Sequence, residues 1–103
     1  MGCYADEPSD SMFTDGHAIS HVMDITECKA FCKTKSALFV GLKNSQECYC
    51  GRSGNLIARH EKLKDSECQM PCAGNSNEIC GGVSSKGQYV VSVHECKCAC
   101  EVV

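Results

Sequence analysis

The sequence predicts a small, disulfide-rich α+β domain, and three observations lead to this fold class. The chain has 103 residues, about the length of one domain. Eleven of them are cysteines, a share above the roughly 8–10 % that marks a disulfide scaffold in a short secreted chain. One stretch has helical periodicity, and several others have the short apolar or alternating pattern of strands. We therefore expect one helix and several short strands, cross-linked by disulfides.

The cysteine content also indicates an oxidising compartment, because the cytosol keeps most thiols reduced. We therefore expect a secreted or extracellular protein. The net charge is −3 and the basic residues are scattered, which argues against a nucleic-acid partner. No apolar run is long enough for a transmembrane helix, so we expect no direct membrane insertion.

A helix is predicted over residues 25–34, after a short extended segment at 3–5 and a polar loop from 6 to about 22. Asp24 can accept a hydrogen bond from the first helical turn, and Glu27 can reach back to the Asp24 amide, which is the pattern of a capping box. The apolar residues Cys28, Phe31 and Cys32 follow at helical spacing and give the helix one buried stripe.

Strands are predicted after the helix. Residues 37–42 form an apolar run, and residues 47–50 are its expected hairpin partner across a turn at Asn44 and Ser45. The valine-rich stretch 88–93 is the last predicted strand. Between them we expect a loop with a short helical piece over 51–64 and a tight loop over 72–82 with cysteines at both ends.

Four cysteines have spacings that match between the helix and the hairpin. Cys28 and Cys32 share one helical face and lie about 6 Å apart along the axis. Cys48 and Cys50 share one face of a strand and lie about 6.6 Å apart. Two parallel disulfides could therefore join the helix to the strand. The alternative is a zinc site made by the same thiols, although zinc ligands are usually spaced C-x₂₋₄-C.

The cysteines and their neighbours resemble the WSC domain, a module named after fungal cell-wall integrity and stress-response sensors. The resemblance covers residues 3 to about 89 and includes all eight cysteines of the family in order. It is carried by these residues: Gly2-Cys3-Tyr4-x-Asp6, Met23, Cys28-x₃-Cys32, Phe39-Val40-Gly41-Leu42, Glu47-Cys48-Tyr49-Cys50-Gly51, Cys68-x₃-Cys72-x-Gly74-Asn75 and Cys80-Gly81-Gly82.

The resemblance implies both a pairing and a shape. The implied disulfides are Cys3–Cys68, Cys28–Cys48, Cys32–Cys50 and Cys72–Cys80. The implied shape is PAN/apple-like, with a short helix packed on a small twisted antiparallel sheet. We accordingly divide the chain into a WSC-like domain, 1–93, and a cysteine-rich tail, 94–103.

The tail holds three cysteines beyond the eight of the family. In an extended chain His94, Cys96, Cys98 and Cys100 lie on one face. An odd number of cysteines indicates a free thiol, a partner in a longer chain or an intermolecular bridge, and a disulfide-linked homodimer is the specific prediction. A soft-metal site made by these four residues is an alternative, and reshuffled pairing within the domain is another. No metal is assigned.

No catalytic motif is present, so we predict a protein that is not an enzyme and needs no cofactor. Nothing matches a nucleophile elbow, a zinc-protease helix or a phosphate-binding loop. His17 and His21 are expected to be exposed loop residues. A redox role would need a thiolate near a base, and the tail offers the only candidates, beside His94 or Lys97.

The predicted function is therefore binding. The resemblance implies cell-wall or extracellular polysaccharide, such as β-glucan, as the ligand. The alternatives are an extracellular protein partner, as in Kremen-type receptors, and a disulfide-linked structural or adhesive role. A metal-binding or redox role of Cys96, Cys98 and Cys100 is a third hypothesis.

Candidate ligand-binding residues are of two kinds. Aromatic platforms could be Phe13 and Tyr89. Tyr4, Phe31, Phe39 and Tyr49 are expected in the core, and Tyr49 is a further candidate because it faces away from Cys48 and Cys50 and is the one of the four expected to be partly exposed. Polar candidates sit in turns that disulfides would hold rigid, which suits recognition because little entropy is lost on binding. They are Asn44, Gln46, Asn75, Asn77 and Glu78, although Asn75 and Asn77 could instead satisfy the backbone of their own loop.

Overall fold

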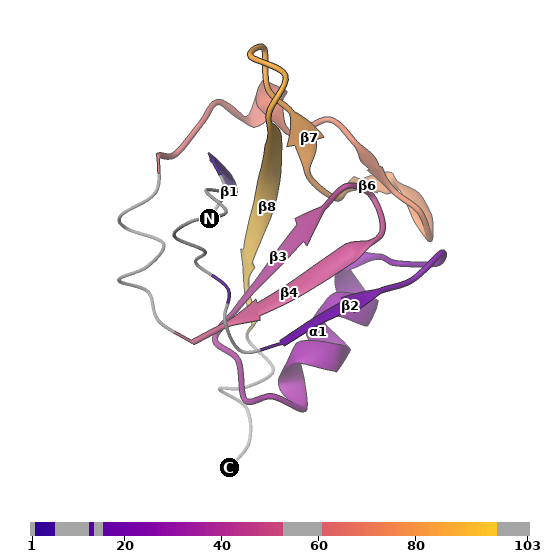
Figure 1. The fold of residues 1–103 in the computed structure, drawn as a ribbon. Coiled ribbons are helices and arrows are strands. Elements are labelled where there is room, and N and C mark those ends of the chain that lie inside the picture. Colours follow the sequence, from indigo (N-terminus) through magenta and orange to yellow (C-terminus); the bar gives the residue numbers. More distant parts are fainter. Residues whose placement is uncertain (1, 6–12, 14–15, 53–60, 97–103) are drawn as a thin grey trace.

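The computed structural model describes residues 2–5, 13, 16–52 and 61–96, and it shows one helix packed against an antiparallel sheet (Figure 1). The sheet order is β1-β8-β3-β4-β2, and β7 also pairs with β8. Its strands are β1 (Gly2–Ala5), β2 (Gly16–Ile19), β3 (Phe39–Lys43), β4 (Glu47–Gly51), β7 (Gly82–Val83) and β8 (Tyr89–Glu95). A separate two-stranded hairpin consists of β5 (Pro71–Cys72) and β6 (Asn75–Ile79). The predicted fold class, small disulfide-rich α+β, is confirmed.

Helix α1 (Ile25–Lys33) begins where the sequence predicts and ends one residue earlier. Asp24 is the N-cap, and its Oδ1 accepts a hydrogen bond of 2.7 Å from the Glu27 amide. A second acceptor comes from a distant strand, because Glu78 Oε1 accepts a bond of 3.0 Å from the Ile25 amide. The helix start is therefore satisfied both locally and by β6.

Strands β3 and β4 form the predicted hairpin, paired from Lys43 with Glu47 to Phe39 with Gly51. The turn between them spans residues 44–46. Asn44 and Ser45 both have positive φ, 56° and 66°, a conformation that asparagine adopts more readily than most residues.

Two segments that we predicted as loops contain strands instead. β2 lies within the predicted loop 6–22 and pairs with β4, with His17 opposite Tyr49 and Ile19 opposite Glu47. β6 lies within the predicted tight loop 72–82, and β5 ends at the first residue of that loop. Both regions are short and mainly polar, so they lack the apolar alternation that marks a strand in sequence.

The two faces of the sheet have different cores. On the helix side, Val40, Leu42 and Cys48 pack with Cys28 and Cys32 of α1. On the outer side, Phe13, Val91 and Val93 form a second cluster, and Tyr4, Phe39 and Tyr49 pack around it. Gly41 makes room for the Phe13 ring, since a Cβ there would lie 2.5 Å from Phe13 Cζ.

Four disulfides connect the described elements: Cys3–Cys68, Cys28–Cys48, Cys32–Cys50 and Cys72–Cys80. These are the pairs that the family resemblance implies. Backbone hydrogen bonds of 3.0 Å from Ser45 to Cys80 and from Ala73 to Ser45 also hold the β3–β4 turn against the Cys72–Cys80 loop. No helix among the described residues is long and apolar enough to cross a membrane.

Candidate binding site

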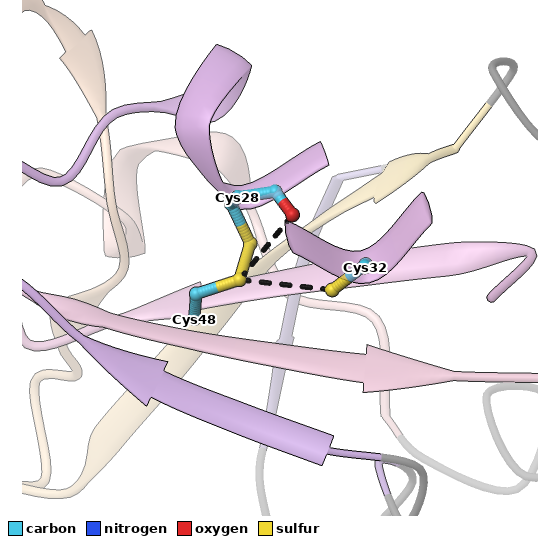
Figure 2. Close-up of side chains that lie close together, drawn as sticks. All are labelled: Cys28, Cys32 and Cys48. Atoms are coloured by element: carbon cyan, nitrogen blue, oxygen red, sulfur yellow. Dashed lines mark hydrogen bonds between the residues drawn. A yellow bond between two sulfur atoms is a disulfide. The ribbon is translucent and has the colours of Figure 1, made fainter. Parts of the chain in front are cut away.

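Two disulfides, Cys28–Cys48 and Cys32–Cys50, join α1 to β4, and the sulfur of Cys32 lies close to the Cys28–Cys48 bridge (Figure 2). Cys32 Sγ lies 3.7 Å from Cys48 Sγ, and the sulfurs of Cys28, Cys32 and Cys48 all lie within 4.8 Å of one another. Sulfurs at such distances could share a metal ion as thiolates. Here all three are bonded in disulfides, so the group holds the helix on the sheet and offers no thiolate to a metal.

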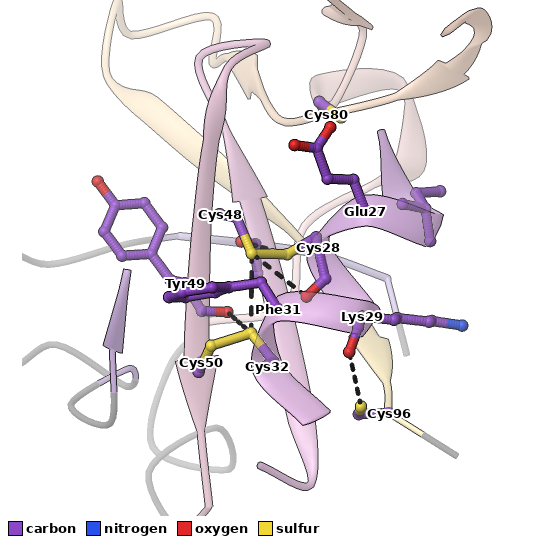
Figure 3. Close-up of a disulfide and its surroundings, with 12 residues drawn as sticks. Glu27, Cys28, Lys29, Phe31, Cys32, Cys48, Tyr49, Cys50, Cys80 and Cys96 are labelled. Carbon is purple, nitrogen blue, oxygen red and sulfur yellow. Dashed lines mark hydrogen bonds between the residues drawn. A yellow bond between two sulfur atoms is a disulfide. The ribbon is translucent and has the colours of Figure 1, made fainter. Parts of the chain in front are cut away.

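Tyr49 points to the opposite side of β4, away from these disulfides (Figure 3). Its ring stacks on His17 of β2 at a centroid distance of 5.8 Å. Lys43 of β3 places its Nζ 5.8 Å from the same centroid, and Phe13 lies at 6.3 Å. The Tyr49 hydroxyl donates a hydrogen bond to Glu47. Neighbours therefore approach this ring from the strands on both sides, and little of its face is left for a ligand.

The polar candidates of the β3–β4 turn gather around Glu47. Asn44 Nδ2 donates a bond of 3.1 Å to Glu47 Oε2. Gln46 accepts a bond from the Ser20 amide through its backbone carbonyl, at 3.0 Å. Asn44 and Tyr49 thus meet at Glu47 through contacts made within the hairpin, and the contact of Gln46 is a backbone bond to the end of β2.

The candidates on β6 also serve the fold. Asn75 Oδ1 accepts a bond of 3.0 Å from the Asn77 amide, so Asn75 satisfies the backbone of its own segment, as the alternative reading of the sequence proposed. Asn77 is exposed. Glu78 caps helix α1.

Phe13 is not available as an exposed platform. Only 8 % of its surface is exposed, because it covers Val91 and Val93 on the outer face of the sheet. The expectation for Phe13 was wrong because its sequence neighbours are polar, and nothing in them indicates contact with strands more than 70 residues away.

Tyr89 is the one aromatic candidate with an open ring, since half of its surface is exposed. It lies at the start of β8 beside a pocket of about 200 Å³. The polar side chains that line this pocket with Tyr89 are Glu61, Glu67, Ser84, Ser85, Lys86 and Gln88. We call this the Tyr89 pocket. The sequence indicated Tyr89 but not the two glutamates, because they come from a segment more than 20 residues earlier.

The turn that forms one wall of the Tyr89 pocket is internally hydrogen-bonded. The Ser84 amide donates to the Gln88 carbonyl at 2.8 Å, and Ser84 Oγ accepts from the amides of Lys86 and Gln88 at 3.3 Å. Gly87 has a φ of 78°, which favours glycine. The wall therefore has a defined shape before any ligand binds.

Comparison with known proteins supports the family. The family model of the WSC domain matches residues 1–82. The chain belongs to the WSC domain family. A WSC domain-containing protein of Arthroderma benhamiae is 38 % identical over 82 residues, which is 78 % of this chain and 11 % of that protein.

Two further relatives have other names, and one comes from an animal and the other from a fungus. Mouse Kremen protein 2 is 28 % identical over 97 residues, 94 % of this chain and 21 % of its own length. A putative fungistatic metabolite of Chaetomium globosum is 30 % identical over 90 residues, 85 % of this chain and 40 % of its own length. The chain thus spans between 11 % and 40 % of the length of these three relatives.

The WSC match ends at residue 82, yet strand β8 lies beyond it, at Tyr89–Glu95. β8 pairs with β1, β3 and β7, so the sheet needs this strand. The Cys96 amide donates a bond of 2.9 Å to the Leu38 carbonyl. The domain limit that we expected at residue 93 falls inside this strand.

Cys96 is the one free cysteine among the described residues, and it is buried, with 1 % of its surface exposed. Its Sγ lies 3.8 Å from the Lys29 carbonyl oxygen on α1 (Figure 3). An intermolecular disulfide or an exposed metal site at Cys96 does not fit this burial, which corrects our expectation for this residue. Cys98 and Cys100 lie outside the described residues, so a disulfide-linked dimer through them stays a prediction for non-reducing electrophoresis.

His94 is half-buried on β8. Loss of solvation lowers the pKa of its imidazole below 6.5, the nearby Lys29 lowers this pKa further, and Glu78 opposes the shift. His94 and Cys96 lie on the helix side of the sheet, as their spacing predicts.

Proposed function

We propose that this WSC domain is an extracellular module that binds polysaccharide, of the β-glucan class, through the Tyr89 pocket. The observation that carries the proposal is the half-exposed Tyr89 ring beside a concave polar pocket. An exposed aromatic ring offers an apolar face with a polar edge, which suits the apolar face of a sugar ring. Four disulfides among the described residues suit an extracellular location.

The polar groups of the pocket fit a ligand rich in hydroxyl groups. Glu61 and Glu67 can accept hydrogen bonds, Lys86 can donate them, and Gln88 can do both. The pocket of about 200 Å³ is smaller than the roughly 300–1,000 Å³ of sites that enclose a whole drug-sized ligand. It therefore suits one sugar ring of a longer chain, with the rest of the polymer outside.

The test is retention of the purified domain on insoluble β-glucan, chitin and xylan. We expect retention on β-glucan and its loss in Tyr89→Ala, because the truncation removes the aromatic face. Ile19→Ala is the matched control: Ile19 is 64 % exposed and lies on β2, across the sheet from the Tyr89 pocket. This variant should be retained like the wild type.

A protein partner is the second candidate, supported by the likeness to Kremen protein 2 and by two exposed apolar side chains, Ile19 and Val22, at and just after β2. The same experiment separates the two functions. Absence of retention on all three polymers would contradict the proposal and favour a protein partner. Retention that Tyr89→Ala does not change would place the sugar site elsewhere.

A further inference from the structure

A second pocket, of about 290 Å³, lies on the helix side of the sheet. Its walls are Ile25 at the start of α1, Ile79 of β6 and the Cys3–Cys68 disulfide. Its polar lining comes from Asp65, Ser92 and His94. We call it the His94 pocket. A mostly apolar surface with a few converging polar groups is the usual composition of a small-ligand site.

His94 has a hydrogen-bonding capacity that the described part of the protein does not use. Within that part of the chain no hydrogen bond or ion pair involves its side chain, although the residue is half-buried. A neutral imidazole has one donor and one acceptor nitrogen, and buried polar groups in proteins are usually paired. Ser92, by contrast, already accepts a bond of 2.9 Å from the Gly81 amide. His94 and the exposed Asp65 are therefore the groups available to a ligand.

The Tyr89 pocket and the His94 pocket are neighbours along the same strands. Val90 lines the first pocket, and Ser92 and His94 line the second. Alternate residues of a strand share a face, so these three side chains lie on the helix side, and about 13 Å separates the first from the last. β1 contributes Ala5 to the first pocket and Cys3 to the second.

One short segment contributes a side chain to each of the two pockets. The 3-10 helix η2 (Asp65–Glu67) contributes Glu67 to the Tyr89 pocket and Asp65 to the His94 pocket. Both carboxylates can accept hydrogen bonds from hydroxyl groups on either side of η2. A ligand that crosses η2 can therefore be bound by acidic side chains along its path.

We propose that the His94 pocket is a second subsite for the same glycan chain, which occupies the Tyr89 pocket, crosses η2 and places a further sugar ring against His94 and Asp65. This inference rests on the proposed polysaccharide function and adds a length requirement to it. Filling both subsites converts the second contact into an intramolecular one, which raises affinity without a change at the first site.

The experiment measures affinity against ligand length by calorimetry. The probes are the β-1,3-linked glucose oligomers from disaccharide to hexasaccharide, or the matching series from chitin or xylan if that polymer retains the domain. We expect the Kd to fall about tenfold or more, equivalent to about 1.4 kcal/mol, once the oligomer reaches from one pocket to the other.

Variants assign this gain to the His94 pocket. His94→Ala and Asp65→Asn should lose the gain for the long oligomers and keep the affinity for the disaccharide. Asp65 is exposed, so its variant tests the subsite even if His94→Ala folds poorly. Glu95→Ala is the matched control, because Glu95 is the exposed neighbour of His94 on β8 and does not line the pocket.

The outcomes separate this inference from the proposed function. Equal affinity for all lengths, or a length gain that survives in both His94→Ala and Asp65→Asn, overturns the second subsite and leaves the Tyr89 site in place. Absence of binding at every length in the unmodified domain, together with absence of retention on the polymers, overturns both.

Discussion

The region around α1 and β4 differs sharply from the opposite end of the sheet, where β1, β8 and residues 61–68 lie together. We call this end the β8 margin. In the first region the side chains contact one another, through two disulfides and through the neighbours of the Tyr49 ring. Along the second, one disulfide crosses the margin and two pockets remain on either side of η2. The disulfide-bonded region thus supplies rigidity, and the β8 margin keeps polar groups available for a ligand.

Removal of a disulfide from the first region should have the largest effect. Cys28 and Cys48 are fully buried, and their bridge spans 20 residues, so Cys28→Ala with Cys48→Ala should lower the free energy of unfolding by about 3 kcal/mol. The measurement is urea unfolding of both proteins. The Cys72–Cys80 bridge spans only 8 residues, so its removal should cost less, and a larger loss there would contradict the loop-length argument.

Tyr49 and Tyr89 should differ in what they contribute: Tyr49 to the stability of the domain, and Tyr89 to ligand binding. Tyr49→Ala should lower the free energy of unfolding by about 2 kcal/mol, since it removes a half-buried ring and the contacts of this ring with its aromatic neighbours. Tyr89→Ala should change stability by less than about 0.5 kcal/mol, because surface substitutions rarely do more, and it should abolish polymer retention. Unfolding and retention are measured on both variants, and a loss of retention in folded Tyr49→Ala would place ligand contacts on the outer face of β4.

The sequence predicted most of the disulfide-bonded region because its signals are local. The capping position of Asp24, the helical spacing of Cys28 and Cys32, and the Asn44–Ser45 turn each involve residues a few positions apart. The WSC resemblance added the pair Cys3–Cys68, which is 65 positions apart, and the short pair Cys72–Cys80, and both are present in the structure.

The β8 margin could not be derived in the same way, because its features join distant segments. The pockets combine residues from β1, from 61–68 and from β8, and no short sequence pattern indicates that these segments lie together. For the same reason the sequence did not indicate the hydrogen bond from the Ile25 amide to the Glu78 carboxylate, since these residues are 53 positions apart. β2 was missed because its one large apolar residue, Ile19, is exposed and its neighbours are small or polar.

Loss of the helix cap should have a smaller effect than loss of the disulfide. Asp24→Ala removes the acceptor for the Glu27 amide and should cost about 1 kcal/mol of unfolding free energy. Two disulfides still hold α1 on the sheet, so the helix itself should persist, which far-ultraviolet circular dichroism can measure. Asp24→Asn is the control, since asparagine is an equally good N-cap, and a loss as large in this variant would show that the charge of Asp24 matters more than its hydrogen bond.

His94 should make the β8 margin slightly less stable in acid. Its pKa in the folded domain is lowered, mainly by burial and next by Lys29, from the value of 6.5 that applies when the chain is unfolded. Below that pH the unfolded chain binds more protons than the folded domain does, so the contribution of neutral His94 is complete above pH 6.5 and is lost as the pH falls toward the folded-state pKa.

Urea unfolding of the wild type and of His94→Gln from neutral to mildly acidic pH measures this contribution. The carboxylates are common to both proteins, so the wild type should lose stability relative to the variant over this range. The opposite slope would show that an acidic neighbour such as Glu78 stabilises the protonated imidazole, and that His94 is charged in the pocket where we place a sugar ring.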